Sequence, residues 1–102
     1  MLDEIAAKQR QIVGLCAEHH VRRLAVFGSS LRKDFDADDS DIDLLVEFEP
    51  LSPGAYADNY FALLSALTSL FDRKVDLVSL RSIENPYFRH EVEATQETLY
   101  AA

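Results

Sequence analysis

The sequence predicts an α/β or α+β fold, a β-sheet with helices packed against it. Short apolar runs typical of buried strands alternate along the chain with segments whose apolar residues recur at helical spacing. Glycine and proline stand between several of these segments, where they favour turns. With 102 residues, 48% of them hydrophobic, the chain suits one compact domain spanning residues 1–102.

In the first half of the chain, two strands are expected after an opening helix. The helix should extend to about His19, because its apolar residues recur at helical spacing: Leu2, Ile5, Ile12, Val13 and Cys16. Residues 24–27 form an apolar run that ends at a glycine-serine turn, which indicates a buried strand and then the start of a helix. Residues 34–40 are mostly polar and are expected to form a loop, followed by a strand over 41–48.

The second half of the sequence predicts a long helix, a strand and a final helix. Pro53-Gly54 indicates a turn before a helix that includes residues 57–71, whose apolar stripe should cover the sheet. Residues 74–80 are typical of a third strand. Pro86 suits the first turn of a last helix, and Leu99-Tyr100 is compatible with a short final strand.

Charge and composition exclude several classes of protein. The formal net charge is −8, from 18 acidic against 10 basic residues, so the overall field repels a nucleic-acid backbone and no direct nucleic-acid partner is expected. No apolar run is long enough for a membrane helix and the first residues are acidic, which favours a cytoplasmic protein. The single cysteine, Cys16, excludes an internal disulfide and is expected to be buried.

Aspartates in two predicted strands indicate a metal site. Asp41 and Asp43 point to the same side of their strand, and two carboxylates held so close are costly unless a cation lies between them. Magnesium suits such a pair, since it prefers carboxylate oxygens and completes its shell with water and phosphate oxygens. Asp76 interrupts an apolar run; if the two strands are neighbours, it can join as a third ligand and as a base for an attacking hydroxyl.

The turn Gly28-Ser29 is a candidate for binding phosphate. It follows a strand and precedes a predicted helix, so backbone N–H groups are available to phosphate oxygens, and the serine hydroxyl adds a donor. Arg32 and Lys33 follow closely and could help to neutralise a triphosphate, although exposed basic residues are more often only solvated.

Two alternative interpretations of the aspartates compete with this one. Asp34, Asp36 and Asp38 match the first ligands of an EF-hand, but Asp39 stands where its glycine and Leu45 where its glutamate are required. The aspartates at 34, 36, 38 and 39 are therefore expected to be solvated loop residues. Asp41, Asp43 and Asp76 could instead be structural carboxylates, and the glycine-serine turn argues against that.

Together these parts resemble the minimal nucleotidyltransferase family of the DNA polymerase β superfamily. The resemblance rests on Phe27-Gly28-Ser29, a spacer, Asp41-Ile42-Asp43 and the later element Lys74-Val75-Asp76-Leu77-Val78. The spacer, residues 30–40, holds eleven residues, one more than the family's usual ten. The resemblance implies a nucleotidyltransferase fold, with a small mixed sheet flanked by helices.

The same resemblance implies a function and a partner. Members of this size are commonly antitoxins of HEPN-domain ribonuclease toxins, so the chain would use Mg²⁺ and ATP to attach AMP to a tyrosine hydroxyl of its HEPN partner. Two alternatives remain open, namely a non-catalytic antitoxin that inhibits by binding alone and a transferase that modifies a small-molecule hydroxyl. Under either transfer reaction Asp41, Asp43 and Asp76 would be the catalytic and metal-binding residues, with Gly28 and Ser29 binding the nucleotide.

Overall fold

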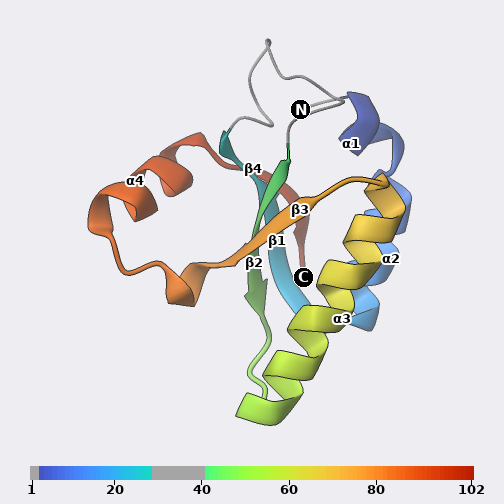
Figure 1. Cartoon of the computed structure of the whole chain (residues 1–102), viewed down its shortest axis with the longest axis horizontal. Helices are drawn as coiled ribbons and strands as arrows, with labels where there is room; N and C mark the ends of the chain where they lie inside the picture. The colour runs from blue at the N-terminus through green and yellow to red at the C-terminus, as the bar shows by residue number, and fades with distance from the viewer. Residues whose placement is uncertain (1–2, 29–40) are drawn as a thin grey trace.

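A four-stranded sheet forms the centre of the computed structural model, which describes residues 3–28 and 41–102 (Figure 1). The order of the strands across the sheet is β3-β2-β1-β4. Their bounds are Val21–Val26 for β1, Ile42–Phe48 for β2, Val75–Ser79 for β3 and Glu97–Ala101 for β4. The α/β prediction is therefore confirmed.

The sheet is mixed, and this places the beginnings of two strands side by side. β1 runs antiparallel to both β2 and β4, whereas β2 and β3 are parallel. Parallel strands need a crossover connection, and the helix α3 (Pro53–Phe71) supplies it. As a result, the amino ends of β2 and β3 meet at the same edge of the sheet, beside the carboxyl end of β1.

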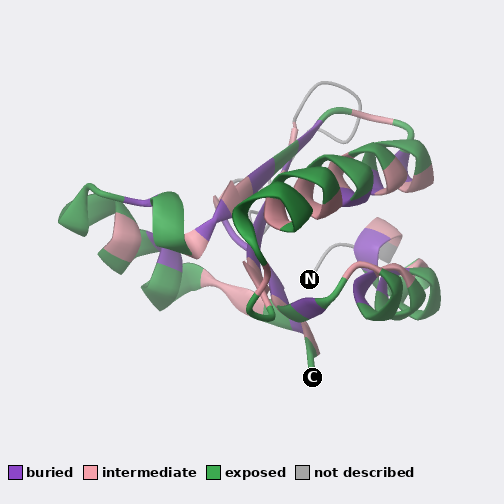
Figure 2. Cartoon of the chain, turned by 90° about the horizontal axis from the view of Figure 1, so that it is seen from below, coloured by how far each residue is buried: buried purple, intermediate pink, exposed green. Residues whose placement is uncertain are grey.

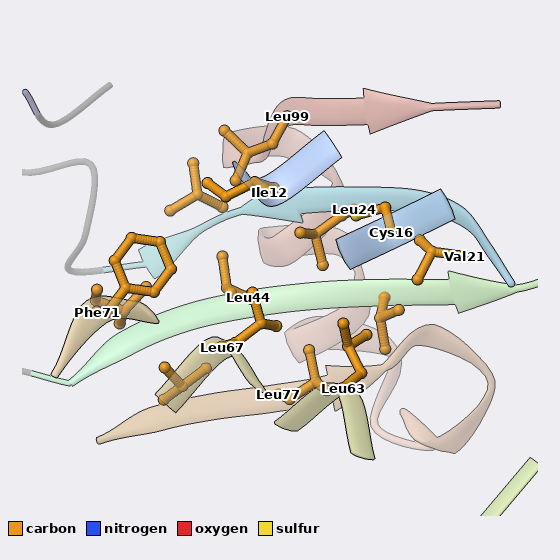
Figure 3. Packing of buried hydrophobic residues seen from close by; sticks show 14 of the residues in the cluster. Ile12, Cys16, Val21, Leu24, Leu44, Leu63, Leu67, Phe71, Leu77 and Leu99 are labelled. Atoms are coloured by element: carbon orange, nitrogen blue, oxygen red, sulfur yellow. The ribbon is translucent and has the colours of Figure 1, made fainter. Parts of the chain in front are cut away.

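One face of the sheet carries the main hydrophobic core. It is covered by α1 (Asp3–Ala7), α2 (Gln9–Glu18) and α3, which lie on the same side of the strands (Figures 1 and 2). Alternate residues of β2 face this core, and α3 contributes the buried side chains of Leu63, Leu67 and Phe71 (Figure 3). The predicted apolar stripe of this helix is confirmed.

On the opposite face of the sheet, α4 (Pro86–Thr95) is the one helix among the described residues (Figure 2). A short 3₁₀ turn, η2 (Leu80–Ser82), leads from β3 towards it. Helix α4 packs on the sheet through a smaller buried cluster: Ala25, Phe27, Leu45, Ile83 and Val92. Pro86 occupies the first turn, as predicted, and the Asn85 side chain caps the helix by accepting hydrogen bonds from the N–H groups of Tyr87 and Phe88 at 2.9 and 3.2 Å.

Two predicted helix boundaries were wrong. The opening helix is divided into α1 and α2, because Lys8 leaves helical geometry (φ −106°, ψ 12°) while its ammonium donates to the carbonyl of Leu70 at 2.6 Å. Pro53-Gly54 does not form a turn before α3 but begins the helix, where a proline needs no hydrogen-bond acceptor for its nitrogen. A local sequence pattern does not show the tertiary contact of Lys8. It also does not show whether a proline lies in a turn before a helix or in the first turn of the helix.

The strands are confirmed with shifted ends. β1 begins three residues before the predicted run, at Val21, and β4 is longer than the predicted pair of residues. β3 ends at Ser79, and Leu80 belongs to the following 3₁₀ turn. The predicted loop over 34–40 lies outside the described residues. No helix in the described ranges is long and apolar enough to cross a membrane.

Candidate active site

The candidate site lies where β1 ends and β2 and β3 begin. Beyond the end of β1, the N–H of Phe27 donates to the carbonyl oxygen of Asp43 at 3.1 Å, so the strand pairing continues up to Gly28. On the other side of β2, Asp43 and Asp76 are partners in the parallel register. Gly28, Asp43 and Asp76 therefore occupy neighbouring positions on three adjacent segments, as their predicted grouping required.

The two aspartates project from the same face of the sheet as α4. Along β2, Asp43 shares its face with Leu45, which packs in the cluster beneath α4. Along β3, Asp76 likewise shares its face with Val78, which packs against the same cluster. Asp43 is half-buried and Asp76 is exposed, so water and a ligand can reach both carboxylates. The sequence analysis placed Asp76 beside Asp43 only if their two strands were neighbours, and β2 and β3 are neighbours.

Gly28 is held against the carboxylate of Asp43. Its φ is +66°, in the left-handed region that favours glycine. A Cβ atom at this position would lie 2.9 Å from Oδ2 of Asp43, closer than carbon and oxygen pack. The turn therefore needs glycine both for its conformation and for the room that it leaves beside the carboxylate.

Asp41 lies just before β2 and has a different neighbour. Its Oδ2 is 3.5 Å from Nζ of Lys74; the lysine side chain is exposed and the aspartate side chain is partly so. Within residues 3–28 and 41–102, no group of three His, Cys, Asp or Glu side chains lies close enough to hold a metal ion. The structure thus brings Asp43 and Asp76 together and places Asp41 at the same edge of the sheet, paired with a lysine.

A cavity of about 220 Å³ opens over the two aspartates and is closed on one side by α4. Gly28, Asp43 and Asp76 form the sheet side of its wall. The helix contributes side chains that the sequence analysis missed: Phe88, Glu91, Val92 and Thr95. Their spacing of i, i+3, i+4 and i+7 is that of one helix face, a signal present in the sequence but not distinguishable there from a core stripe.

Three tyrosines lie outside the wall of this cavity. Tyr56 and Tyr60, on α3, are half-buried, whereas Tyr87 is 85% exposed. The hydroxyl of Tyr60 donates to the carbonyl of Leu77. Burial, and then the negative charge of Asp76, raises the pKa of the Tyr60 phenol, so this hydroxyl stays protonated.

Cys16 and the histidines do not line this cavity, and three further polar residues lie outside the described part of the chain. Cys16 is fully buried, as expected, and burial raises the pKa of its thiol to about 12. His19 follows α2 as its C-cap, with Nδ1 at 2.7 Å from the carbonyl oxygen of Leu15, and His20 and His90 are exposed. Ser29, Arg32 and Lys33 lie outside the part of the chain that the structure describes.

A family model described as "Polymerase beta, Nucleotidyltransferase" matches residues 10–102. The chain belongs to this family. The match covers every strand, α3 and α4, including all three aspartates of the predicted site. The predicted resemblance is confirmed, and the protein is a nucleotidyltransferase by family.

Relatives from Methanocaldococcus jannaschii are similar over nearly the whole length. Two of them, each named "Putative protein adenylyltransferase", are 34% and 36% identical to this chain. In both, the similarity covers 90% of this chain and 88% of the relative.

Solved structures share the fold. One described as "Structure of putative minimal nucleotidyltransferase" has a TM-score of 0.76 and 35% identity, and the alignment covers 94% of this chain and 95% of that one. A toxin–antitoxin structure with AMP-PNP has a TM-score of 0.66 at 26% identity, covering 92% and 73% of the two chains. Another, of a tri-AMPylated Shewanella oneidensis HEPN toxin with its MNT antitoxin, has a TM-score of 0.59 at 26% identity, covering 95% and 72%.

Proposed function

We propose that this nucleotidyltransferase moves AMP from ATP to a tyrosine hydroxyl of a HEPN-domain toxin and thereby acts as its antitoxin. The observation that carries the proposal is the line formed by Gly28, Asp43 and Asp76 across three adjacent segments, at the mouth of one cavity. The names of the relatives support protein adenylylation, and the AMPylated HEPN toxin in one similar complex supports the class of acceptor.

The residues present are compatible with magnesium. Asp43 and Asp76 are in register on neighbouring strands and line the same cavity, and one or two carboxylates with substrate phosphates are the usual protein ligands of this ion. We propose Asp43 and Asp76 as its ligands, with Asp41 as a third once its carboxylate leaves Lys74. When bound, the ion would neutralise charge on the phosphates during transfer.

The chain's own residues supply binding and a base. In the proposed reaction the tyrosine oxygen forms a bond to the α-phosphorus of ATP, the bond from that phosphorus to pyrophosphate breaks, and Asp76 accepts the phenolic proton. We propose that the N–H of Gly28 and the hydroxyl of Ser29 donate to phosphate oxygens. The wall formed by α4 limits the approach of water on one side.

Mass spectrometry of the cognate HEPN protein tests this proposal. Incubation with the chain, ATP and Mg²⁺ should add whole AMP units to the HEPN protein and lower its ribonuclease activity. Asp43→Asn and Asp76→Asn remove a charge with little change of shape. Asp76→Asn should slow transfer by roughly 10²-fold or more, since general-base catalysis alone contributes about that much, and Asp43→Asn should slow transfer by removing a proposed metal ligand. Asp58→Asn, on the exposed side of α3, is the matched control and should transfer normally.

Other outcomes would identify the alternatives. An unmodified HEPN protein that is nevertheless inhibited would contradict transfer and indicate inhibition by binding alone. Pyrophosphate release with small-molecule alcohols but not with the HEPN protein would indicate a small-molecule acceptor.

A further inference from the structure

A second cavity lies at the other end of β2, and its wall carries three arginines against two glutamates, Glu47 and Glu49. Its volume is about 480 Å³, and the arginines in its wall are Arg22, Arg81 and Arg89. The wall also includes residues 46–51, at the carboxyl end of β2, so along the strand this arginine cavity lies about 10–17 Å from Asp43, at about 3.3 Å per residue.

Helix α4 contributes to both cavities. Phe88 and Glu91 line the aspartate cavity, whereas Arg89, between them in sequence, lines the arginine cavity. A protein bound across α4 would therefore contact both cavities at once. The two would select opposite charges, because the described wall of the aspartate cavity carries Asp43, Asp76 and Glu91 and no basic side chain.

Two of the three arginines are available to a partner. Arg89 is 3.3 Å from Glu93, so its charge is partly satisfied within α4. Arg22 and Arg81 are exposed, and neither forms an ion pair with another described residue. Of the two glutamates in the wall, Glu47 is paired with Arg23 at 3.4 Å.

Arg81 is held in place before any partner binds. Its guanidinium lies over the ring of Tyr56, 4.4 Å from the centroid. The hydroxyl of Tyr56 in turn donates to Oγ of Ser79 at 2.6 Å, which fixes the ring. A planar guanidinium that is already oriented loses less entropy when it binds a carboxylate.

We propose that the arginine cavity is the docking site for an acidic segment of the protein that accepts the nucleotide. This inference depends on the proposed function, which requires a protein acceptor. In a chain of net charge −8, a local group of arginines attracts acidic side chains to this place and so fixes the orientation of the partner. The acidic segment occupies the arginine cavity while the acceptor hydroxyl reaches Asp43 and Asp76 on the other side of α4.

The test uses the full chain and its cognate HEPN protein. Affinity is measured without ATP, at low and at high salt, for the wild type, the double variant Arg22→Ala/Arg81→Ala and the matched control Arg10→Ala on the opposite, α2 side. The double variant should weaken binding at least about tenfold and reduce the salt dependence, and in transfer assays the loss should fall on KM for the partner more than on kcat. Arg10→Ala should bind as the wild type does. Circular dichroism establishes that each variant is folded.

A charge exchange identifies the occupant. The Arg81→Glu variant should bind the HEPN protein more weakly than the double alanine variant does. Changing the acidic HEPN residue that contacts position 81 to lysine should restore the affinity. Unchanged partner affinity in the double variant would overturn the proposal, as would a failure of every acidic-to-lysine change to rescue Arg81→Glu. Loss of a second binding site for ATP or inorganic phosphate, with normal partner affinity, would overturn it too and identify a small-anion site instead. Since these affinities are measured without ATP, an absence of AMP transfer would overturn the proposed function separately.

Discussion

At the scale of single residues, the chain offers a matched pair of glycines. Gly28 has a φ of +66°, and a Cβ atom there would lie 2.9 Å from the Asp43 carboxylate, whereas Gly14, inside α2, has open space around it. Gly28→Ala should cost about 1–2 kcal/mol of stability and displace the Asp43 carboxylate, lowering AMP transfer. Gly14→Ala should instead stabilise the chain by about 1 kcal/mol. Urea unfolding and transfer assays on both variants check this, and equal effects of the two would contradict the proposed contact.

Cys16 gives the stability a dependence on alkaline pH. Burial raises the pKa of its thiol from 9.0 to about 12, so above pH 9 the unfolded chain loses this proton before the folded one does. The stability from this group is therefore complete below pH 9 and falls as the pH rises towards 12, by at most about 1.4 kcal/mol per pH unit. Urea unfolding at a series of alkaline pH values should show a shallower decline for Cys16→Ala than for the wild type. Parallel curves would show that the thiol does not contribute.

At the scale of secondary-structure elements, the N-terminal cap of α4 can be tested by mutation. The Asn85 side chain caps it, whereas Ser52 at the start of α3 makes no capping hydrogen bond with its side chain. Asn85→Ala should cost about 1 kcal/mol and loosen the wall that carries Phe88 and Glu91, while Asn85→Asp should retain the cap. Ser52→Ala should change stability little. Thermal unfolding measures both, and a larger loss from Ser52→Ala would contradict the assigned caps.

The elements also show what a sequence pattern can and cannot predict. The strand containing Asp43 and the stripe on α3 were predictable because strand alternation and helical spacing are local properties. The break at Lys8 coincides with a hydrogen bond from its ammonium to the carbonyl of Leu70, which is distant in sequence. The adjacency of Asp43 and Asp76 depends on the parallel pairing of β2 and β3, which the sequence analysis could only assume.

The residues of α4 at the site were missed for a related reason. Glu91 and Val92 both line the cavity, but Val92 is also buried in the core cluster whereas Glu91 is exposed, and only the position of α4 on the sheet shows this. The arginine cavity was missed too, because Arg22 and Arg81 come from distant parts of the chain. The residues of one strand or turn were predictable as candidates, whereas the contribution of α4 and of the arginines depends on tertiary packing.

At the scale of the whole molecule, the net charge of −8 predicts that the binding of a nucleotide depends on a cation. ATP is itself an anion, and the described wall of the aspartate cavity contributes three more carboxylates, those of Asp43, Asp76 and Glu91. ATP in the presence of EDTA should therefore raise the melting temperature little, because like charges repel in the cavity. Saturating ATP with Mg²⁺, at about 100 times the dissociation constant, should stabilise the chain by about 2.7 kcal/mol.

Differential scanning fluorimetry with ATP, Mg²⁺ and EDTA in each combination measures this dependence. Asp43→Asn is the informative variant, because it removes one negative charge from the cavity as well as one proposed ligand. If charge repulsion alone limited binding, this variant would bind ATP better in EDTA and equally well with Mg²⁺. If Asp43 holds the ion, the variant should lose most of the stabilisation that ATP and Mg²⁺ give together. A shift with ATP in EDTA as large as the shift with Mg²⁺ would show that the cavity binds the nucleotide without a metal and would contradict the proposed role of the carboxylates.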